Sequence, residues 1–163
     1  MQDIEHCLRT RMSQMLDEDF AIFRCGMANG ADLLFAQVAL RLREQYPGLL
    51  KFTAVIPCLD HDKGWRDSDR ILCSKITDSA DEVVLVSNSH YYDGCMAKRN
   101  RYLITGCDEL IAVYDGQRGG TMQTINFAKA SRIKVTVIDP SKGIIITLRE
   151  SVDVNQLSLL GEY

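Results

Sequence analysis

Two glycine-rich turns contain the residue types that hold phosphate groups. The first turn, Gly26 to Asp32, reads GMANGAD and separates a short apolar run from a helical pattern. Its two glycines permit close backbone approach and left-handed angles, and the free N–H groups of the following helix attract an anion. The structural alternative is that Asn29 caps the helix and the glycines only form the turn.

The second turn, Asp115 to Thr121, reads DGQRGGT and again lies between an apolar run and a helical pattern. Three glycines in five positions, followed by Thr121 and Thr124, are typical of a phosphate cradle. No Gly-Lys-Ser/Thr follows, so this is not a Walker A motif, and the spacing is not GxGxxG either. The alternative is a flexible loop with Thr121 as the helix cap.

A run of cations lies between the two turns, where Lys98, Arg99 and Arg101 occupy three of four positions near the start of a helical pattern. Arginine suits bidentate contact with phosphate, although a solvated helix face is the usual place for such a run. Trp65 is the single tryptophan and follows the polar segment DHDKG. Its ring could stack on a base or pack against the helix that carries Ile71.

Apolar runs and helical periodicities alternate along the whole chain. Helices are predicted over residues 2–17, 28–45, 64–79, 95–104 and 121–130, and strands over 20–25, 52–56, 83–86, 110–114, 135–138 and 144–148. The strands are continuous apolar runs, which indicates burial on both faces of a parallel sheet. The predicted class is α/β and Rossmann-like: a mostly parallel sheet with helices on both faces.

Ligands bind such sheets outside the carboxyl ends of the strands. We therefore expect the turns 26–32 and 116–121 to flank one pocket, with Arg99 at its rim. The predicted ligand-binding residues are Gly26, Met27, Asn29, Gly30, Asp32, Trp65, Arg99, Asn100, Asp115, Gly119, Gly120, Thr121 and Thr124.

The composition predicts one cytoplasmic domain over residues 1–163. A net charge of -3 and a pI near 5.6 disfavour nucleic acid and anionic membranes as partners. No apolar run reaches membrane-spanning length. The six cysteines are scattered without metal-ligand spacing, so they are interpreted as reduced core residues. His61 with Asp60 and Asp62 is at best a loop cluster, no metal site is expected, and no catalytic triad or Cys–His pair is recognised.

The segment from Gly26 to Pro140 resembles the YpsA-like branch of the SMF/DprA–LOG (SLOG) superfamily. The motifs that carry the resemblance are CGMANGAD at 25–32, IPCLDHDKGW at 56–65, CMAKRNRYLI at 95–104, CDELIAVYDG at 107–116 and GGTMQTINFA at 119–128. The resemblance implies a Rossmann-like fold that binds or senses nucleotides or nucleotide-derived ligands. No cofactor is predicted apart from a nucleotide-type ligand.

Two other functions known in the superfamily remain as alternatives. LOG enzymes cleave the ribose–base bond of nucleoside monophosphates with an arginine from one motif and an acid from a second motif. Met96 and Arg99 match the arginine motif, whereas Gln123 and Thr124 stand where the second motif carries acids. A hydrolase would then need another carboxylate, from Asp32 or Asp115. DprA-like binding of single-stranded DNA is disfavoured by the acidic pI.

Family members normally begin with a strand that ends in a Gly-x-Arg turn, and this chain begins in what resembles the helix after it. We expect the gap to lie between residues 20–25 and 83–86, which would pair directly or accept a strand from a second chain in a homodimer. The short link 139–143 predicts that 144–148 pairs antiparallel with 135–138.

Overall fold

The computed structural model describes residues 2–19 and 21–148. They divide into two compact units, one within residues 8–103 and one of residues 2–7 with 104–148, and each unit is described by itself. The division falls inside α1 (Gln2–Glu18) and just before the last residue of α4 (Cys95–Ile104). The α/β, Rossmann-like class is confirmed, and three of the four strand pairings are parallel.

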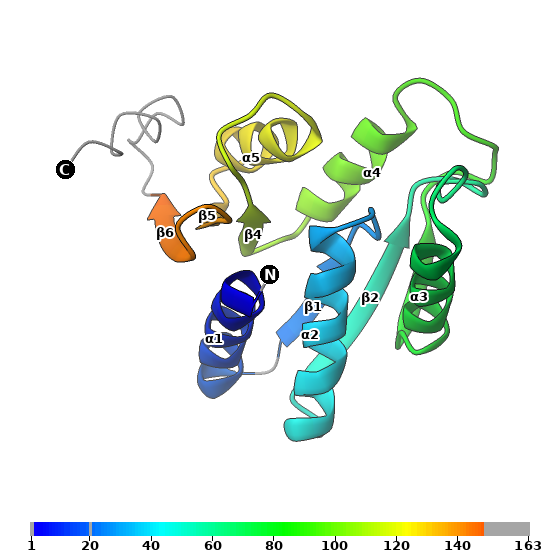
Figure 1. Cartoon of the computed structure of the whole chain (residues 1–163). Coiled ribbons are helices and arrows are strands. Elements are labelled where there is room, and N and C mark those ends of the chain that lie inside the picture. Colours follow the sequence, from blue (N-terminus) through cyan, green and yellow to red (C-terminus); the bar gives the residue numbers. More distant parts are fainter. Residues whose placement is uncertain (1, 20, 149–163) are drawn as a thin grey trace. The chain divides into compact units, whose positions relative to one another are not determined.

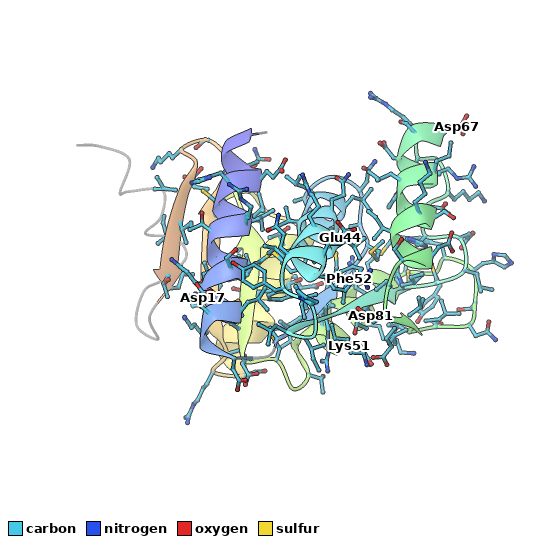
Figure 2. The ribbon with its side chains drawn as sticks, turned by 90° about the horizontal axis from the view of Figure 1, so that it is seen from below. Asp17, Glu44, Lys51, Phe52, Asp67 and Asp81 are labelled. Atoms are coloured by element: carbon cyan, nitrogen blue, oxygen red, sulfur yellow. The ribbon has the colours of Figure 1, made fainter. Side chains whose placement is uncertain are left out.

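The unit of residues 8–103 contains a parallel sheet in the order β1 (Ala21–Cys25), β2 (Leu50–Ile56), β3 (Glu82–Leu85). Helices α2 (Ala31–Gln45) and α3 (Asp67–Asp78) connect these strands in turn (Figure 1). Asp81 anchors the start of β3 beside β2, because its carboxylate accepts from the Phe52 N–H at 2.8 Å and its N–H donates to the Phe52 carbonyl at 2.9 Å (Figure 2).

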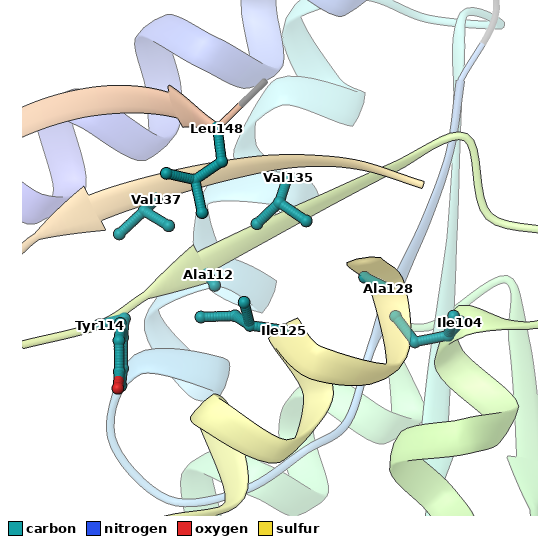
Figure 3. Close-up of a cluster of buried hydrophobic side chains, with 8 residues drawn as sticks. All are labelled: Ile104, Ala112, Tyr114, Ile125, Ala128, Val135, Val137 and Leu148. Atoms are coloured by element: carbon teal, nitrogen blue, oxygen red, sulfur yellow. The ribbon is translucent and has the colours of Figure 1, made fainter. Parts of the chain in front are cut away.

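The unit that contains the C-terminal strands has a sheet in the order β4 (Glu109–Val113), β5 (Lys134–Asp139), β6 (Ile144–Leu148), with α5 (Gly120–Ala130) between β4 and β5. Helix α5 packs on β4 and β5 around a buried apolar cluster (Figure 3). The cluster consists of Ile104, Ala112, Tyr114, Ile125, Ala128, Val135, Val137 and Leu148. The predicted antiparallel pairing of β6 with β5 is confirmed.

The expected position of a gap between residues 20–25 and 83–86 is wrong, because β2 lies between β1 and β3 and pairs with both. Each crossover, through α2 and then α3, adds the next parallel strand on the same side of the sheet. Residue 20 lies outside the described residues. A strand supplied by a second chain stays a prediction.

Three further expectations need correction. The described strands form two three-stranded sheets rather than one. Burial on both faces holds for the central strands β2 and β5, whereas Val83 and Leu85, which point to the same face of the edge strand β3, are exposed, so that face is left largely uncovered. Helix α2 begins at Ala31 rather than Ala28, because Met27 (φ 53°) and Gly30 (φ 86°) hold the turn out of helical geometry.

Candidate functional site

The turn between β1 and α2 has an unusual backbone. Met27 adopts a positive φ of 53° although it is fully buried and has a side chain, a conformation that few non-glycine residues adopt. Gly30 is the N-cap of α2 at φ 86° and ψ -116°, a region open essentially to glycine alone. No N-cap side chain covers the first N–H groups of the helix. The turn therefore presents backbone N–H groups at a helix N-terminus, where anions are favoured.

Asn29 does not cap this helix. Its amide Nδ2 instead donates to Asp69 Oδ2 at 3.1 Å, which links the turn to the first residues of α3. The turn is also held from within, because Asp32 Oδ2 accepts from the Ala28 N–H at 3.1 Å and Cys25 Sγ donates to the Asp32 carbonyl at 3.1 Å.

The guanidinium of Arg99 lies over this turn. Its Nη1 donates to Asp32 Oδ2 at 3.2 Å, and a Cβ added to Gly26 would overlap both Nη1 and Cζ. Arg99 is 6% exposed, and its Nε is buried without a protein hydrogen-bond partner. Arg99 therefore holds the turn from α4 and still has one N–H group to donate.

The run of cations separates into two environments. Lys98 and Arg101 are exposed, as expected of a solvated helix face, whereas Arg99 and Asn100 are buried. Burial of an arginine requires a partner for its charge, which Asp32 supplies. Arg99 is thus the member of this run that the fold directs to the turn.

Cys25 at the end of β1 is a neutral thiol at this site. Burial raises the pKa of the Cys25 thiol well above its ordinary value, and the Asp32 carboxylate raises it further, against the smaller opposing effects of a hydrogen bond from the Met27 backbone and of the Arg99 charge. A thiolate is the nucleophilic form, so Cys25 is not poised for nucleophilic catalysis.

Trp65 belongs to the same unit and packs edge-on against His61, with ring centroids 5.6 Å apart and an interplanar angle of 80°. His61 is absent from the residues that the sequence singled out for binding. Its Nε2 lies 3.7 Å from Cys73 Sγ on α3, and its Nδ1 is buried without a partner. The polar sequence around His61 does not predict that Nδ1 is buried, because this burial depends on contacts with residues distant in the chain.

The turn between β4 and α5 lines a pocket of about 320 Å³ in the other unit. The lining residues are Val113, Tyr114, Asp115, Gln117, Arg118, Gly119, Gly120, Thr121 and Pro140. Gly119 is the N-cap of α5 and makes no side-chain hydrogen bond, so Thr121 is not the cap. Asp115 Oδ1 accepts from the Gln117 N–H at 3.0 Å, and the Thr124 hydroxyl donates to the Gly120 carbonyl at 2.9 Å.

Each predicted binding residue therefore falls in one of two places. Gly26, Met27, Asn29, Gly30, Asp32, Trp65, Arg99 and Asn100 belong to the unit of residues 8–103, and Asp115, Gly119, Gly120, Thr121 and Thr124 to the other. One pocket shared by both turns stays a prediction.

Within residues 2–19 and 21–148, no three His, Cys, Asp or Glu side chains are grouped as a metal site would need. No helix in that part combines the length and apolar character needed to cross a bilayer.

Parallel strands joined by helices, with glycine-rich turns after the strands, define a Rossmann-like α/β protein. A model of the YpsA family, described as the YspA SLOG family, matches residues 1–142. The chain belongs to this family, as its motifs indicated, and that membership is consistent with a nucleotide-related binding role.

Curated relatives are similar over the same region. A UPF0398 protein of Bacillus pumilus (strain SAFR-032) is 28% identical over 122 residues, which are 74% of this chain and 65% of that protein. The uncharacterized SPbeta prophage-derived protein YoqJ of Bacillus subtilis (strain 168) is 28% identical over 118 residues, 66% of this chain and 68% of that protein. A UPF0398 protein of Bacillus thuringiensis (strain Al Hakam) is 26% identical over 123 residues, 75% of this chain and 66% of that protein. The chain thus spans about two thirds of the length of these relatives, and slightly less than two thirds for the Bacillus pumilus and Bacillus thuringiensis proteins.

Proposed function

We propose that this protein binds the phosphate of a nucleotide or nucleotide derivative at the turn from Gly26 to Asp32. The observation that carries the proposal is Arg99, a buried cation packed against Gly26 with an Nε–H group that has no protein acceptor. A buried donor without a partner costs about 1–3 kcal/mol, and a phosphate oxygen would supply the acceptor.

The N-terminus of α2 adds a second source of attraction for an anion. The helix is 15 residues long, and its N-cap Gly30 leaves the first N–H groups without a side-chain acceptor. Aligned peptide dipoles place partial positive charge at this end of the helix. Together with Arg99, these groups favour a phosphate over a neutral ligand.

Asp32 is the acidic group of the proposed site. Its carboxylate is 37% exposed and is already neutralised in part by Arg99 at 3.2 Å. A carboxylate beside a phosphate-binding turn can accept hydrogen bonds from ribose hydroxyls, although the acid with this role in dinucleotide-binding folds lies about 20 residues further along the chain. This arrangement supports a nucleotide rather than inorganic phosphate as the ligand.

The pocket at residues 113–121 offers a further cradle in its own unit. Arg118 and the N-terminus of the 11-residue helix α5, which has no side-chain cap, are part of its lining. We propose that Gly119 and Gly120 allow a phosphate to approach the backbone there. Gly120→Val should weaken nucleotide binding without unfolding the protein, because it places a side chain where the phosphate would lie.

Native mass spectrometry of the purified protein tests the proposal first, by showing whether a nucleotide co-purifies. Isothermal titration with adenosine monophosphate then compares the wild type with Arg99→Ala, which should weaken binding about ten- to a hundredfold through loss of a charge-assisted pair. Lys98→Ala is the matched control, because Lys98 is the exposed neighbour on the same helix. Equal affinities of the wild type and Arg99→Ala would refute the proposed site.

A further inference from the structure

Cys58 and Cys95 form a pair of thiols that the proposed nucleotide site does not use. Cys58 lies in the loop after β2, and Cys95 is the first residue of α4. Their Sγ atoms are 4.0 Å apart, and both residues are fully buried. The two cysteines are 37 positions apart in the sequence, so only the fold brings them together.

The separation of the two sulfurs is close to what a disulfide bond requires. The bond is about 2.05 Å long, so each sulfur would have to move by about 1 Å, which rotation about the side-chain torsion of each cysteine can supply. The Sγ atoms of the other four cysteines contact oxygen or nitrogen atoms; these are Cys7, Cys25, Cys73 and Cys107. The contact between two sulfurs therefore sets this pair apart.

An exposed stretch of chain adjoins the pair. Residues 88–94, which lead from β3 to α4, are all exposed, as is Leu59 in the loop after β2. The Leu59 N–H donates to the Ser89 carbonyl at 3.0 Å. The Tyr91 N–H donates to Asp60 Oδ1 at 2.6 Å. Exposed loops open locally at far lower cost than core strands, so release of these two hydrogen bonds would admit a small oxidant to the sulfurs without unfolding of the protein.

Cys58 is a neutral thiol while it is buried. Burial raises the pKa of Cys58 above its ordinary value and the contact with Cys95 raises it further, against the smaller opposing effect of a hydrogen bond from the Asp60 backbone. Oxidants react with the thiolate, so the closed pair reacts slowly. Opening hydrates the sulfurs and removes the effect of burial, so access and ionisation increase together.

We infer that Cys58 and Cys95 are a redox-sensitive pair, which hydrogen peroxide closes to a disulfide within one chain and a small dithiol reopens. The inference goes beyond the proposed nucleotide site and does not depend on it. Arg99 lies one helical turn after Cys95 on the same helix, so the disulfide would also tie the helix that holds this arginine to the loop after β2.

The oxidation proceeds in two balanced steps. One thiolate sulfur attacks hydrogen peroxide: an S–O bond forms, the O–O bond breaks, and the leaving hydroxide takes up the proton of that thiol as water, which leaves a sulfenic acid. The second sulfur attacks the sulfenic sulfur: the S–S bond forms, the S–O bond breaks, and hydroxide leaves with the second thiol proton as water. Two thiols and one peroxide thus give one disulfide and two water molecules, with two electrons passing from sulfur to peroxide.

Mass spectrometry of the full chain after treatment with hydrogen peroxide, with peptide mapping under non-reducing conditions, tests the inference. The mass of a single chain should fall by two hydrogen atoms, and the peptides that contain Cys58 and Cys95 should be joined. Dithiothreitol should restore the original mass. Cys58→Ser should lose the linkage. Cys107→Ser is the matched control and should retain it, because Cys107 belongs to the other unit and a hydroxyl can still donate to the Glu109 carbonyl.

Cys107 also separates the inference from oxidation that simply follows exposure. It is half-buried, whereas the other five cysteines are buried, so exposure alone would direct peroxide to Cys107 first. The inference is overturned if Cys107 is oxidised while Cys58 and Cys95 still react with iodoacetamide after denaturation, or if either of the pair is joined to a different cysteine. Should Cys58→Ser not fold, the wild type decides alone, because the joined peptides are either present or absent in its digest.

Discussion

Arg99 and Gly26 are in such close contact that the arginine occupies the space where a side chain at position 26 would begin. A Cβ built on Gly26 would overlap Nη1 and Cζ of Arg99 and would lie 2.9 Å from Asp32 Oδ2. The backbone at position 26 does not have a positive φ that would require glycine. Gly30 is the opposite case, because its φ is 86° but the space around it is open. The two glycines of one turn are thus required for different reasons, one for space and one for backbone conformation.

Gly26→Ala should displace Arg99 from the turn. The added methyl group cannot share the space of a buried guanidinium, so we expect a loss of about 1–3 kcal/mol in the free energy of unfolding. Urea denaturation measures it. Combining Gly26→Ala with Arg99→Ala should recover part of the loss, since the main clash is then gone. Simple additivity of the two changes would contradict the proposed cause.

Gly30→Ala should also destabilise the protein, by a different mechanism. The backbone at φ 86° and ψ -116° is strained for any residue with a Cβ, at a cost of about 1–3 kcal/mol. No atom lies within 4 Å of the new methyl group, so Arg99→Ala should give no recovery here. Denaturation of the double variant distinguishes the two glycines, and recovery at position 30 would argue against backbone strain.

The purified protein should not release free base from nucleoside monophosphates at an enzyme-like rate. Gln123 and Thr124 stand where the hydrolases of the superfamily carry acids, and the Thr124 hydroxyl is engaged with the Gly120 carbonyl at 2.9 Å. Neither side chain supplies a carboxylate to stabilise a cationic transition state. Chromatographic detection of adenine from adenosine monophosphate tests this. Base release that survives repurification and disappears in Arg99→Ala would show the prediction wrong, and Asp32→Asn and Asp115→Asn would then identify the carboxylate.

The sequence predicted local structure better than long-range arrangement. Residues 95–104 and 144–148 form α4 and β6 with the bounds expected from periodicity and flanking turn residues. The position of the gap in the sheet was wrong, because strand order depends on pairings between residues far apart in the chain. Arg99 was identified from its residue type, but its burial could not be predicted. The surroundings of His61 could not be predicted either, because its local sequence is polar, whereas its ring packs against Trp65 and lies 3.7 Å from Cys73 of α3.

Asp60 links two loops that follow neighbouring strands, and its ionisation should contribute to stability. Its Oδ1 accepts from the Tyr91 N–H at 2.6 Å, and its Oδ2 lies 3.5 Å from His90 Nδ1. The hydrogen bond from Tyr91 lowers the pKa of Asp60 below its ordinary value, with a further contribution from His90. A carboxyl group whose pKa is lower in the folded than in the unfolded protein stabilises the fold above the unfolded pKa, near about 4. That contribution is lost as the pH falls through the folded value.

Asp60→Asn should therefore reduce stability at neutral pH and have progressively less effect in acid. The amide retains an oxygen that can accept from Tyr91 but carries no charge, so the change isolates the ionised form. Urea denaturation of the wild type and the variant between about pH 7 and pH 3 should give unfolding free energies that differ at the upper end and approach each other as the pH falls below about 4. Asp93→Asn, an exposed acid in the loop that Asp60 contacts, is the matched control and should show no such convergence. A difference between the wild type and Asp60→Asn that stays constant across this range would mean that the hydrogen bond from Tyr91 does not depend on the charge of Asp60.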